Sequence, residues 1–105
     1  MQPAEFQSLL VRQPALMLYF YNDTCGVCTV LWPQVSRLME ERFPKIHLVR
    51  IEAAQSRELA GQLRMLSVPG MVLFLEGKEY FRATGNLSLG ELETKTSRLY
   101  EMMFE

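Results

Sequence analysis

The apolar and polar residues follow two periods along the chain, one typical of strands and one typical of helices. Residues 15–21 form an unbroken apolar run, the pattern of a central strand covered on both faces. Residues 46–51 form a second strand-length run. Residues 71–75 and 79–83 flank a short loop whose Gly77 can adopt positive φ, so we expect an antiparallel hairpin. The pattern predicts a mixed sheet of about four strands.

Segments with helical spacing of apolar residues lie between and around these strands. They are residues 3–11, 25–41, 55–66 and the segment after Ser88. In 25–41 the apolar residues recur at helical spacing from Val30 to Met39, with Pro33 inside the pattern, so we predict a long helix with a kink near the proline. Strands and helices that alternate without a linker predict one α/β domain over residues 1–105.

The last helix has a clear start signal. Ser88 and Glu91 have the spacing of a capping box, and Leu87 and Leu92 have that of a hydrophobic staple. We therefore expect the helix to begin directly after Ser88.

Composition excludes several classes of protein. The chain has 105 residues, 49% of them apolar and 22% charged, with a formal net charge of -1. These values argue against disorder and against nucleic-acid binding, which needs a basic surplus. The longest apolar run has seven residues against the roughly 20 that a membrane-spanning helix needs. The first ten residues lack a basic residue, unlike a secretory signal, so we expect a cytoplasmic protein without membrane association.

The chemistry of the chain centres on Cys25-Gly26-Val27-Cys28. Cysteines at i and i+3 directly after a strand-ending turn fall on one face of the first turn of the next helix. The positive end of that helix favours a thiolate, so the pKa of the first thiol should lie below the ordinary value of about 8.5. We interpret Cys25 as the attacking nucleophile and Cys28, one turn deeper, as the resolving thiol.

Two other interpretations of the pair remain open at this point. Two cysteines supply half of a zinc site, and His47 is the one histidine in the chain, so a zinc site needs ligands from a second chain. The spacing can also arise by chance. We therefore predict no metal site within one chain, and we keep a metal shared between chains as an alternative.

The chain resembles the thioredoxin family over nearly its whole length. CGVC follows the first long apolar strand, as CGPC does in the family, and Pro33 matches the proline of the following helix. Ser67-Val68-Pro69 matches the segment that ends in the family's cis-proline, and Gly77 and Gly85 match two family glycines. The resemblance implies a thioredoxin fold, a cis Val68-Pro69 bond, and a redox-active Cys25–Cys28 disulfide that needs no other cofactor.

The resemblance also implies a docking groove for substrate around the cysteines. The backbone of Val68 would pair with an extended substrate segment beside Cys25 and Pro69. The other residues that would rim the groove are Tyr21, Thr24, Gly26, Val27, Gly70, Gly85 and Asn86.

The chain departs from the family beneath the cysteines. Tyr19 stands where thioredoxins have a buried aspartate, and Arg50 matches a family lysine. We hypothesise that Tyr19 and Arg50 form a phenol–guanidinium pair, with Glu52 as a further member. Neither group is a good base near neutral pH, so resolution of a mixed disulfide should be slow, and Tyr19→Asp should speed turnover.

Further departures lie in the groove and at the sheet edge. Thr24 and Val27 replace a tryptophan and a proline of the family, which points to a different substrate preference. The family's N-terminal strand has no counterpart, so strand 46–51 should lie at an edge, with Ile46 and Leu48 on one face and His47, Val49 and Ile51 on the other. We expect a monomer in preference to a dimer through this edge.

Together these features predict a thiol-disulfide oxidoreductase that reduces or exchanges disulfides in cytosolic proteins. A protein-disulfide substrate and an electron donor, either a reductase or a low-molecular-weight thiol, are the implied partners. The rival interpretation is a thioredoxin-like binding or assembly module whose cysteines are regulatory or hold a metal between chains.

Overall fold

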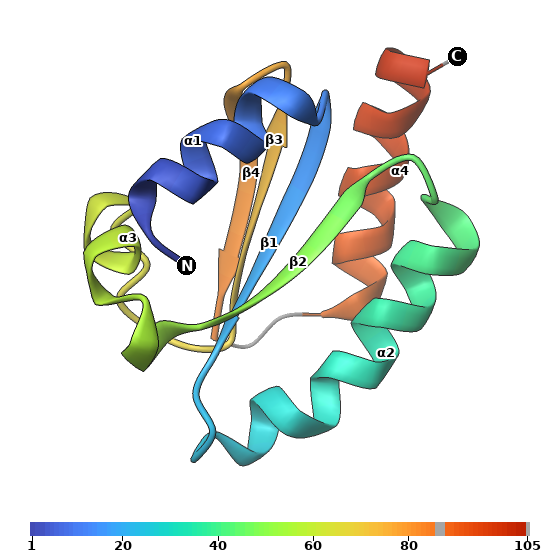
Figure 1. Cartoon of the computed structure of the whole chain (residues 1–105). Coiled ribbons are helices and arrows are strands. Elements are labelled where there is room, and N and C mark those ends of the chain that lie inside the picture. Colours follow the sequence, from blue (N-terminus) through green and yellow to red (C-terminus); the bar gives the residue numbers. More distant parts are fainter. Residues whose placement is uncertain (86–87, 105) are drawn as a thin grey trace.

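A computed structural model describes residues 1–85 and 88–104 of the chain. Helices and strands alternate as far as a final hairpin and helix (Figure 1). The elements are α1 Pro3–Arg12, β1 Ala15–Tyr21, α2 Gly26–Arg42, β2 His47–Glu52, the short 3₁₀ helix η1 Ala53–Gln55, α3 Arg57–Gln62, β3 Gly70–Leu75, β4 Lys78–Thr84 and α4 Leu89–Phe104. Within the described ranges, no helix combines the length and apolarity needed to cross a membrane.

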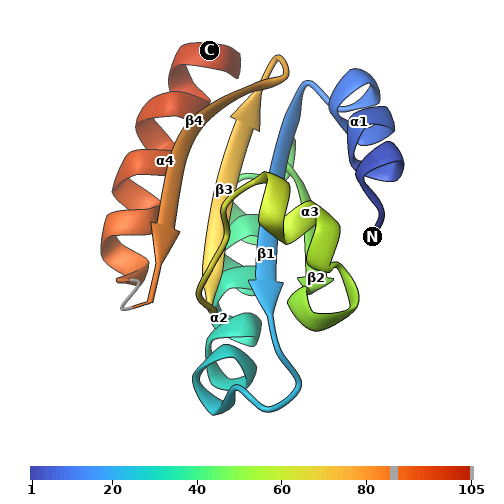
Figure 2. The same ribbon diagram turned by 90° about the vertical axis from the view of Figure 1, so that its left-hand side faces the viewer.

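The four strands form one mixed sheet in the order β2-β1-β3-β4 (Figures 1 and 2). β1 runs parallel to β2 and antiparallel to β3, and β3 pairs antiparallel with β4. The mixed sheet expected from the sequence is therefore confirmed. β1 has a strand on either side, and six of its seven residues are buried.

Helices cover both faces of the sheet, and each face has its own apolar core (Figure 1). Met17 and Tyr19 of β1 pack in the core beneath α2 and α4. Leu16 and Leu18 point the other way, into the core beneath α1 and α3. Successive strand side chains point to opposite faces, so a strand covered on both faces is apolar at every position.

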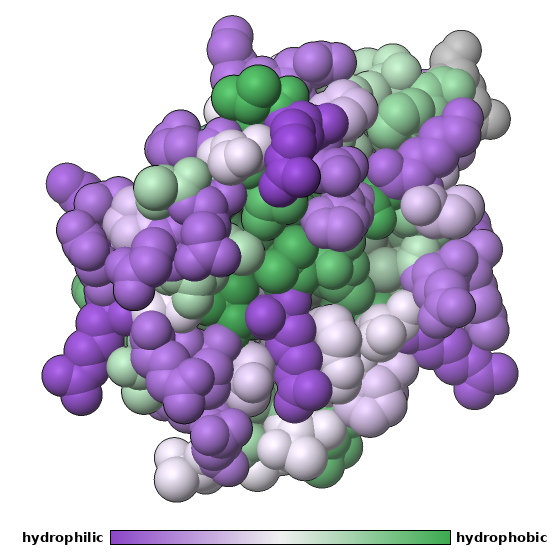
Figure 3. Space-filling view, in the orientation of Figure 1, coloured by the Kyte–Doolittle hydropathy of each residue, from purple (hydrophilic) through white to green (hydrophobic). Residues whose placement is uncertain are grey.

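β2 lies at one edge of the described sheet, as the sequence predicts. Ile46 and Leu48 pack in the core on the α2 side, and Val49 and Ile51 pack in the other core, also as predicted. His47 is exposed. Figure 3 shows apolar side chains gathered over β2 in the middle of this face. The edge strand thus carries apolar side chains that are only partly covered.

The first turns of α2 extend beyond the end of the sheet (Figures 1 and 2). Further along, Val35 and Met39 are buried against the strands. Val30 belongs to the same helical pattern, but its side chain is 67% exposed. The helical spacing was read correctly, but the sheet ends before it reaches this turn. The helix continues through Pro33 to Arg42.

The third helix is shorter than the predicted range 55–66. It ends because Arg64 adopts a left-handed conformation with φ 54°. The backbone N–H of Met65 donates to the carbonyl of Ala60 at 2.8 Å, and that of Arg64 donates to the carbonyl of Gly61 at 3.1 Å. These two bonds form a Schellman motif, which usually has glycine at the left-handed position. Because arginine occupies this position, the sequence did not indicate where the helix ends.

The hairpin and the last helix agree with the sequence predictions. Glu76 and Gly77 connect β3 to β4 with φ values of 50° and 79°, which suit a two-residue turn of type I′. Ser88 Oγ accepts a hydrogen bond from the backbone N–H of Glu91 at 3.3 Å, as an N-cap does. The predicted staple involves Leu87, which lies outside the described residues.

Candidate redox site

A short turn connects the central strand β1 to α2. The backbone N–H of Cys25 donates to the carbonyl of Asn22 at 3.0 Å and closes this turn. Cys25 has extended backbone dihedrals and is the N-cap residue of α2. Its side chain therefore lies at the positive end of the helix, where an anion is stabilised.

Cys25 and Cys28 form a disulfide across the first turn of α2, with their Cα atoms 5.3 Å apart. Cys25 Sγ accepts a hydrogen bond from the backbone N–H of Cys28 at 3.1 Å. An N-cap residue usually satisfies this N–H with a side-chain oxygen, so the sulfur takes the place of that oxygen. In the reduced protein a thiolate at this atom would accept a stronger, charge-assisted bond.

The two cysteines differ in their access to solvent. Cys25 is half-buried, whereas Cys28 is only 1% exposed. A disulfide in another protein can approach Cys25, but the packing around Cys28 keeps it out. This asymmetry agrees with the predicted depths of the two cysteines, and the order of attack stays a prediction.

Tyr19 lies beneath the cysteines and is completely buried. Its hydroxyl donates a hydrogen bond to the carbonyl of Cys28 at 2.8 Å, and its ring centroid lies 5.0 Å from that of Trp32. Burial raises the pKa of Tyr19, and the nearby charge of Arg50 lowers it by a smaller amount. The phenol is therefore a neutral donor at physiological pH.

Arg50 lies near enough to Tyr19 for its charge to lower the pKa of the phenol, as the hypothesised pair requires, but no hydrogen bond joins the two side chains. The two residues are neighbours in the register of β1 and β2, but the Tyr19 hydroxyl is bound to Cys28. The Arg50 guanidinium lies over the rings of Tyr21 and Trp32, with Cζ 4.3 and 5.1 Å from the two centroids. Cation–π attraction holds it there, and the side chain stays exposed.

Glu52, the suggested further member of that pair, serves a local role. Its carboxylate accepts a hydrogen bond from the backbone N–H of Ala54 at 3.0 Å and caps η1. Pro33 is exposed on α2. Among the described residues, neither makes a hydrogen bond to the cysteines.

The loop before β3 contains the cis Val68-Pro69 bond that the resemblance implies. Pro69 is buried, and its carbonyl accepts a hydrogen bond from the backbone N–H of Gly85 at 3.0 Å. Gly85 has φ 70°, a conformation that favours glycine. Within residues 1–85 and 88–104, the backbone of Val68 makes no hydrogen bond, which leaves it available for an incoming strand.

Gly70, like Pro69, is buried. A Cβ atom there would lie 2.3 Å from Met65 Sδ and 3.1 Å from the Ser67 carbonyl. Gly70 is therefore needed for packing under the loop and does not suit the rim. The remaining rim residues are exposed or half-buried, namely Tyr21, Thr24, Gly26, Val27, Val68 and Gly85. Asn86 lies outside the described residues.

An apolar hollow of about 540 Å³ lies on α2 next to the cysteines, lined by Gly26, Val27, Val30, Leu31 and Gln34. Val27 and Val30 are both strongly exposed. Sequence reasoning did not single out Val30 as a surface residue, because it was counted only as part of the helical pattern of apolar residues. Its spacing of three residues from Val27 was the available signal, since residues three apart share a helix face.

The described residues contain no group of three or more histidine, cysteine, aspartate or glutamate side chains arranged to hold a metal ion.

Comparisons with known proteins agree with the geometry. The thioredoxin family model matches residues 1–98. The thioredoxin-like protein YdfQ of Bacillus subtilis is 33% identical over 85 residues, which cover 81% of this chain and 75% of the relative. The crystal structure of thioredoxin from Trypanosoma brucei brucei has a TM-score of 0.85 at 18% identity, with 96% and 90% of the two chains covered. Oxidised mitochondrial thioredoxin 3 from Saccharomyces cerevisiae gives 0.79 at 21% identity, with 95% and 89% covered. The similarity to these two solved structures shows the fold alone.

Proposed function

The chain belongs to the thioredoxin family, whose general activity is thiol-disulfide exchange, and we propose that it reduces disulfides in cytosolic proteins through Cys25 and Cys28. The observation that carries the proposal is the placement of the two sulfurs. The accessible Cys25 is the N-cap of α2, and the disulfide joins it to the buried Cys28.

The reaction takes two exchange steps. The Cys25 thiolate attacks one sulfur of the client disulfide, so that bond breaks, one client thiolate leaves and a mixed disulfide forms. The Cys28 thiolate then attacks Cys25 Sγ and releases the second client thiolate. Two electrons pass from the dithiol to the client, the Cys25–Cys28 disulfide forms, and the client thiolates take up the two protons.

The first step uses the features at the N-terminus of α2. The helix end and the N–H of Cys28 stabilise negative charge on Cys25, so the nucleophilic form is populated nearer neutral pH. The second step needs Cys28 to lose its proton. The neutral Tyr19 beneath Cys28 cannot accept this proton, so the second step is the slower one.

Client binding combines backbone and apolar contacts. An extended client segment would pair with the free backbone of Val68, as in β-strand addition. Its neighbouring apolar side chains would enter the hollow formed by Val27 and Val30. Tyr21, Thr24 and Gly85 complete the rim.

The oxidised pair is returned to the dithiol by a reductase or by a low-molecular-weight thiol. That donor supplies two electrons and is itself oxidised to a disulfide. The protein acts in the cytoplasm, and its cysteine pair is the only redox group that this cycle requires.

Turnover of a protein disulfide with a small dithiol as electron source tests the proposal. The wild-type chain should accelerate reduction, and Cys25→Ser should abolish the acceleration. Cys28→Ser should instead accumulate a covalent mixed disulfide with the client, visible as a mass increase that a reductant reverses. A Ser67→Ala control should retain most of the activity, because a conservative exchange in the Pro69 loop leaves both sulfurs in place.

Absence of catalysed turnover by the wild-type chain, together with a stoichiometric metal or a constitutive dimer, would favour the binding or assembly module instead. A redox titration of the cysteine pair against a dithiol buffer distinguishes a reductant from an oxidant. A midpoint near the oxidising end of the roughly -270 to -120 mV range of the fold would contradict the reductase direction.

A further inference from the structure

Two hydrogen bonds on the main chain of Cys28 lead from the centre of the sheet to the reactive sulfur. The Tyr19 hydroxyl donates to the Cys28 carbonyl at 2.8 Å, and the Cys28 N–H donates to Cys25 Sγ at 3.1 Å. We propose that Tyr19 is a positioning residue that holds the Cys28 N–H against the Cys25 sulfur and so favours the Cys25 thiolate. This inference rests on the proposed role of Cys25 as nucleophile.

Tyr19 lies on β1, which hydrogen-bonds to a neighbouring strand on each side. β1 is paired on both sides, and Tyr19 itself lies opposite Arg50 of β2 and Met71 of β3. The first turns of α2, by contrast, extend past the end of the sheet (Figure 2). The Tyr19 hydroxyl therefore links the first turn of α2, which has few contacts with the sheet, to the central strand β1. Because the bond is buried away from competing water, it is stronger than an exposed one.

The hydrogen bond from the Tyr19 hydroxyl to the Cys28 carbonyl is present at every pH at which the thiol titrates. Burial raises the pKa of Tyr19 above its ordinary value near 10, so the hydroxyl keeps its proton while Cys25 changes charge. The same fact excludes Tyr19 as the base that accepts the proton of Cys28. Its influence on the reaction therefore acts through the position of the Cys28 backbone.

Other charges near this turn also influence a thiolate. Arg50 faces Tyr19 from β2, Glu52 follows at the end of that strand, and Asp23 precedes Cys25 in the turn. The first turn of α2 has no acidic residue. Exchange of Tyr19 for phenylalanine removes a hydroxyl and leaves all of these charges in place, so their contributions cancel in the comparison.

The test measures Cys25 alone in a Cys28→Ser background, which keeps the N–H and carbonyl of position 28. The rate of attack on a small aromatic disulfide and the ultraviolet absorbance of the thiolate are followed against pH, with and without Tyr19→Phe. We expect the thiolate absorbance of the Tyr19→Phe protein to appear at higher pH. Its rate should fall about two- to tenfold at about pH 6, the size of one neutral hydrogen bond, and match the parent at about pH 9.5.

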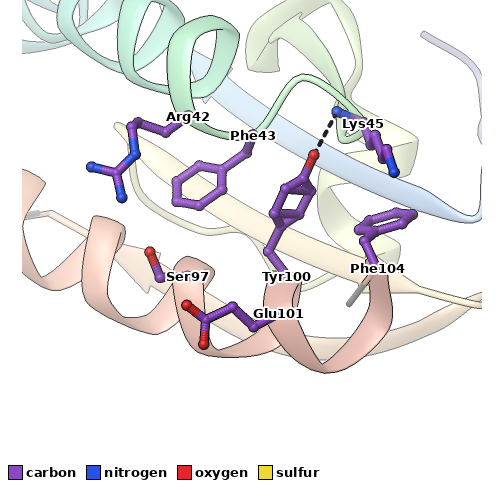
Figure 4. A pocket seen from close by; sticks show the side chains of 7 residues that line it. All are labelled: Arg42, Phe43, Lys45, Ser97, Tyr100, Glu101 and Phe104. Carbon is purple, nitrogen blue, oxygen red and sulfur yellow. Dashed lines mark hydrogen bonds between the residues drawn. The ribbon is translucent and has the colours of Figure 1, made fainter.

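Tyr100→Phe in the same background is the matched control. The Tyr100 hydroxyl accepts a hydrogen bond from the backbone N–H of Lys45 at 3.2 Å, at the opposite end of α2 (Figure 4). This exchange also removes one hydroxyl bonded to the main chain, but it should leave the pH profile of Cys25 unchanged. A general loss of stability would affect both variants, whereas a shift of the profile in Tyr19→Phe alone supports positioning.

Coincident pH profiles of Tyr19→Phe and its parent overturn the inference, and so does an equal fall in rate at all pH values. If Tyr19→Phe does not fold, NMR of the unaltered chain decides, because the Tyr19 hydroxyl proton must be protected from exchange with water. Rapid exchange of that proton overturns the inference. These readouts need no protein client, so failure of the proposed reductase function is observed separately as absent turnover by the wild-type chain.

Discussion

The two ends of α2 place similar side chains in opposite situations. At the N-terminal end, Val27 and Val30 are strongly exposed and Cys25 is accessible beside them. At the C-terminal end, the aromatic ring of Phe43 is only 2% exposed and packs edge-on against Tyr100, with ring centroids 5.2 Å apart. One end leaves apolar surface open, and the other end closes it.

The closed end is built from residues of α2, the following loop and α4 (Figure 4). Tyr100 packs against Phe104 with centroids 4.8 Å apart, and Lys45 Nζ lies 5.2 Å from the Phe104 ring centroid. Arg42 in the last turn of α2 pairs with Glu93 of α4. Cations here match the negative end of the helix, just as the sulfur matches the positive end.

The comparison separates reactivity from stability along one helix. A tyrosine hydroxyl binds the main chain at each end, but only Tyr19 touches a residue that also contacts the reactive sulfur. Substitutions at the closed end should therefore change the free energy of unfolding and leave the chemistry intact. Substitutions at the open end should do the reverse.

The largest effect should come from Phe43→Ala at the closed end. Removal of a buried aromatic side chain lowers the free energy of unfolding by about 3–5 kcal/mol, a large share of the roughly 5–15 kcal/mol typical of a domain. Urea unfolding at low temperature measures this loss. The rate of Cys25 attack, measured on the folded fraction, should stay within twofold of wild type; a larger change would show that the two ends are coupled.

Thr96→Val on α4 should have a smaller effect of the opposite sign, a gain in stability. Thr96 is completely buried, and its Oγ1 has no hydrogen-bond partner among the described residues. Valine has nearly the same shape without the hydroxyl, so the free energy of unfolding should rise by about 1 kcal/mol. Thermal unfolding measures the gain.

Thr94→Val supplies the control on the same helix. Thr94 is exposed, and its hydroxyl donates to the Gly90 carbonyl at 2.9 Å. This exchange should produce no gain. Equal responses of the two variants would mean that the buried hydroxyl of Thr96 is satisfied in solution.

Tyr19 also predicts the sign of an alkaline effect on stability. Since burial raises the pKa of Tyr19 in the folded state, the folded protein holds the phenolic proton more tightly than the unfolded chain does. This contribution is fully present below about pH 10 and is lost as the pH rises towards the folded-state pKa. Unfolding titrations should therefore show a steeper alkaline loss of stability for wild type than for Tyr19→Phe. Parallel pH curves would contradict the buried, protonated phenol.

The sequence predicted the sheet because its strongest signals are local. The apolar run of β1 indicates a strand that is covered on both faces, and the CGVC motif indicates a turn from a strand into a helix. The end of the third helix at Arg64 and the exposure of Val30 were not predicted, because a left-handed arginine has no composition signal and because helical spacing does not reveal where the sheet ends.

The site was predicted less completely than the fold. The resemblance pointed to Tyr19 and its neighbour Arg50, but the hydrogen bond from the Tyr19 hydroxyl to the Cys28 carbonyl was not predicted, because strand register does not show where a side chain ends. Gly70 was assigned to the rim through the resemblance to the family, which does not show how deeply the residue is buried in this chain. Its contact with Met65 depends on the path of the intervening loop, which no short motif encodes.

The smallest expected effect on stability is that of Val30→Ser at the open end. An exposed side chain contributes within about 0.5 kcal/mol to the free energy of unfolding, so thermal unfolding should hardly change. If a client occupies the apolar hollow, the loss of apolar contact should raise KM about threefold while kcat stays constant.

Val11→Ser is the matched control for that substitution. Val11 is also strongly exposed, but it lies on α1, which covers the other face of the sheet. Its exchange should leave KM unchanged, because clients that bind beside Cys25 do not reach α1. Equal KM values for Val30→Ser and wild type would limit client binding to the Pro69 loop and remove the hollow from the docking surface.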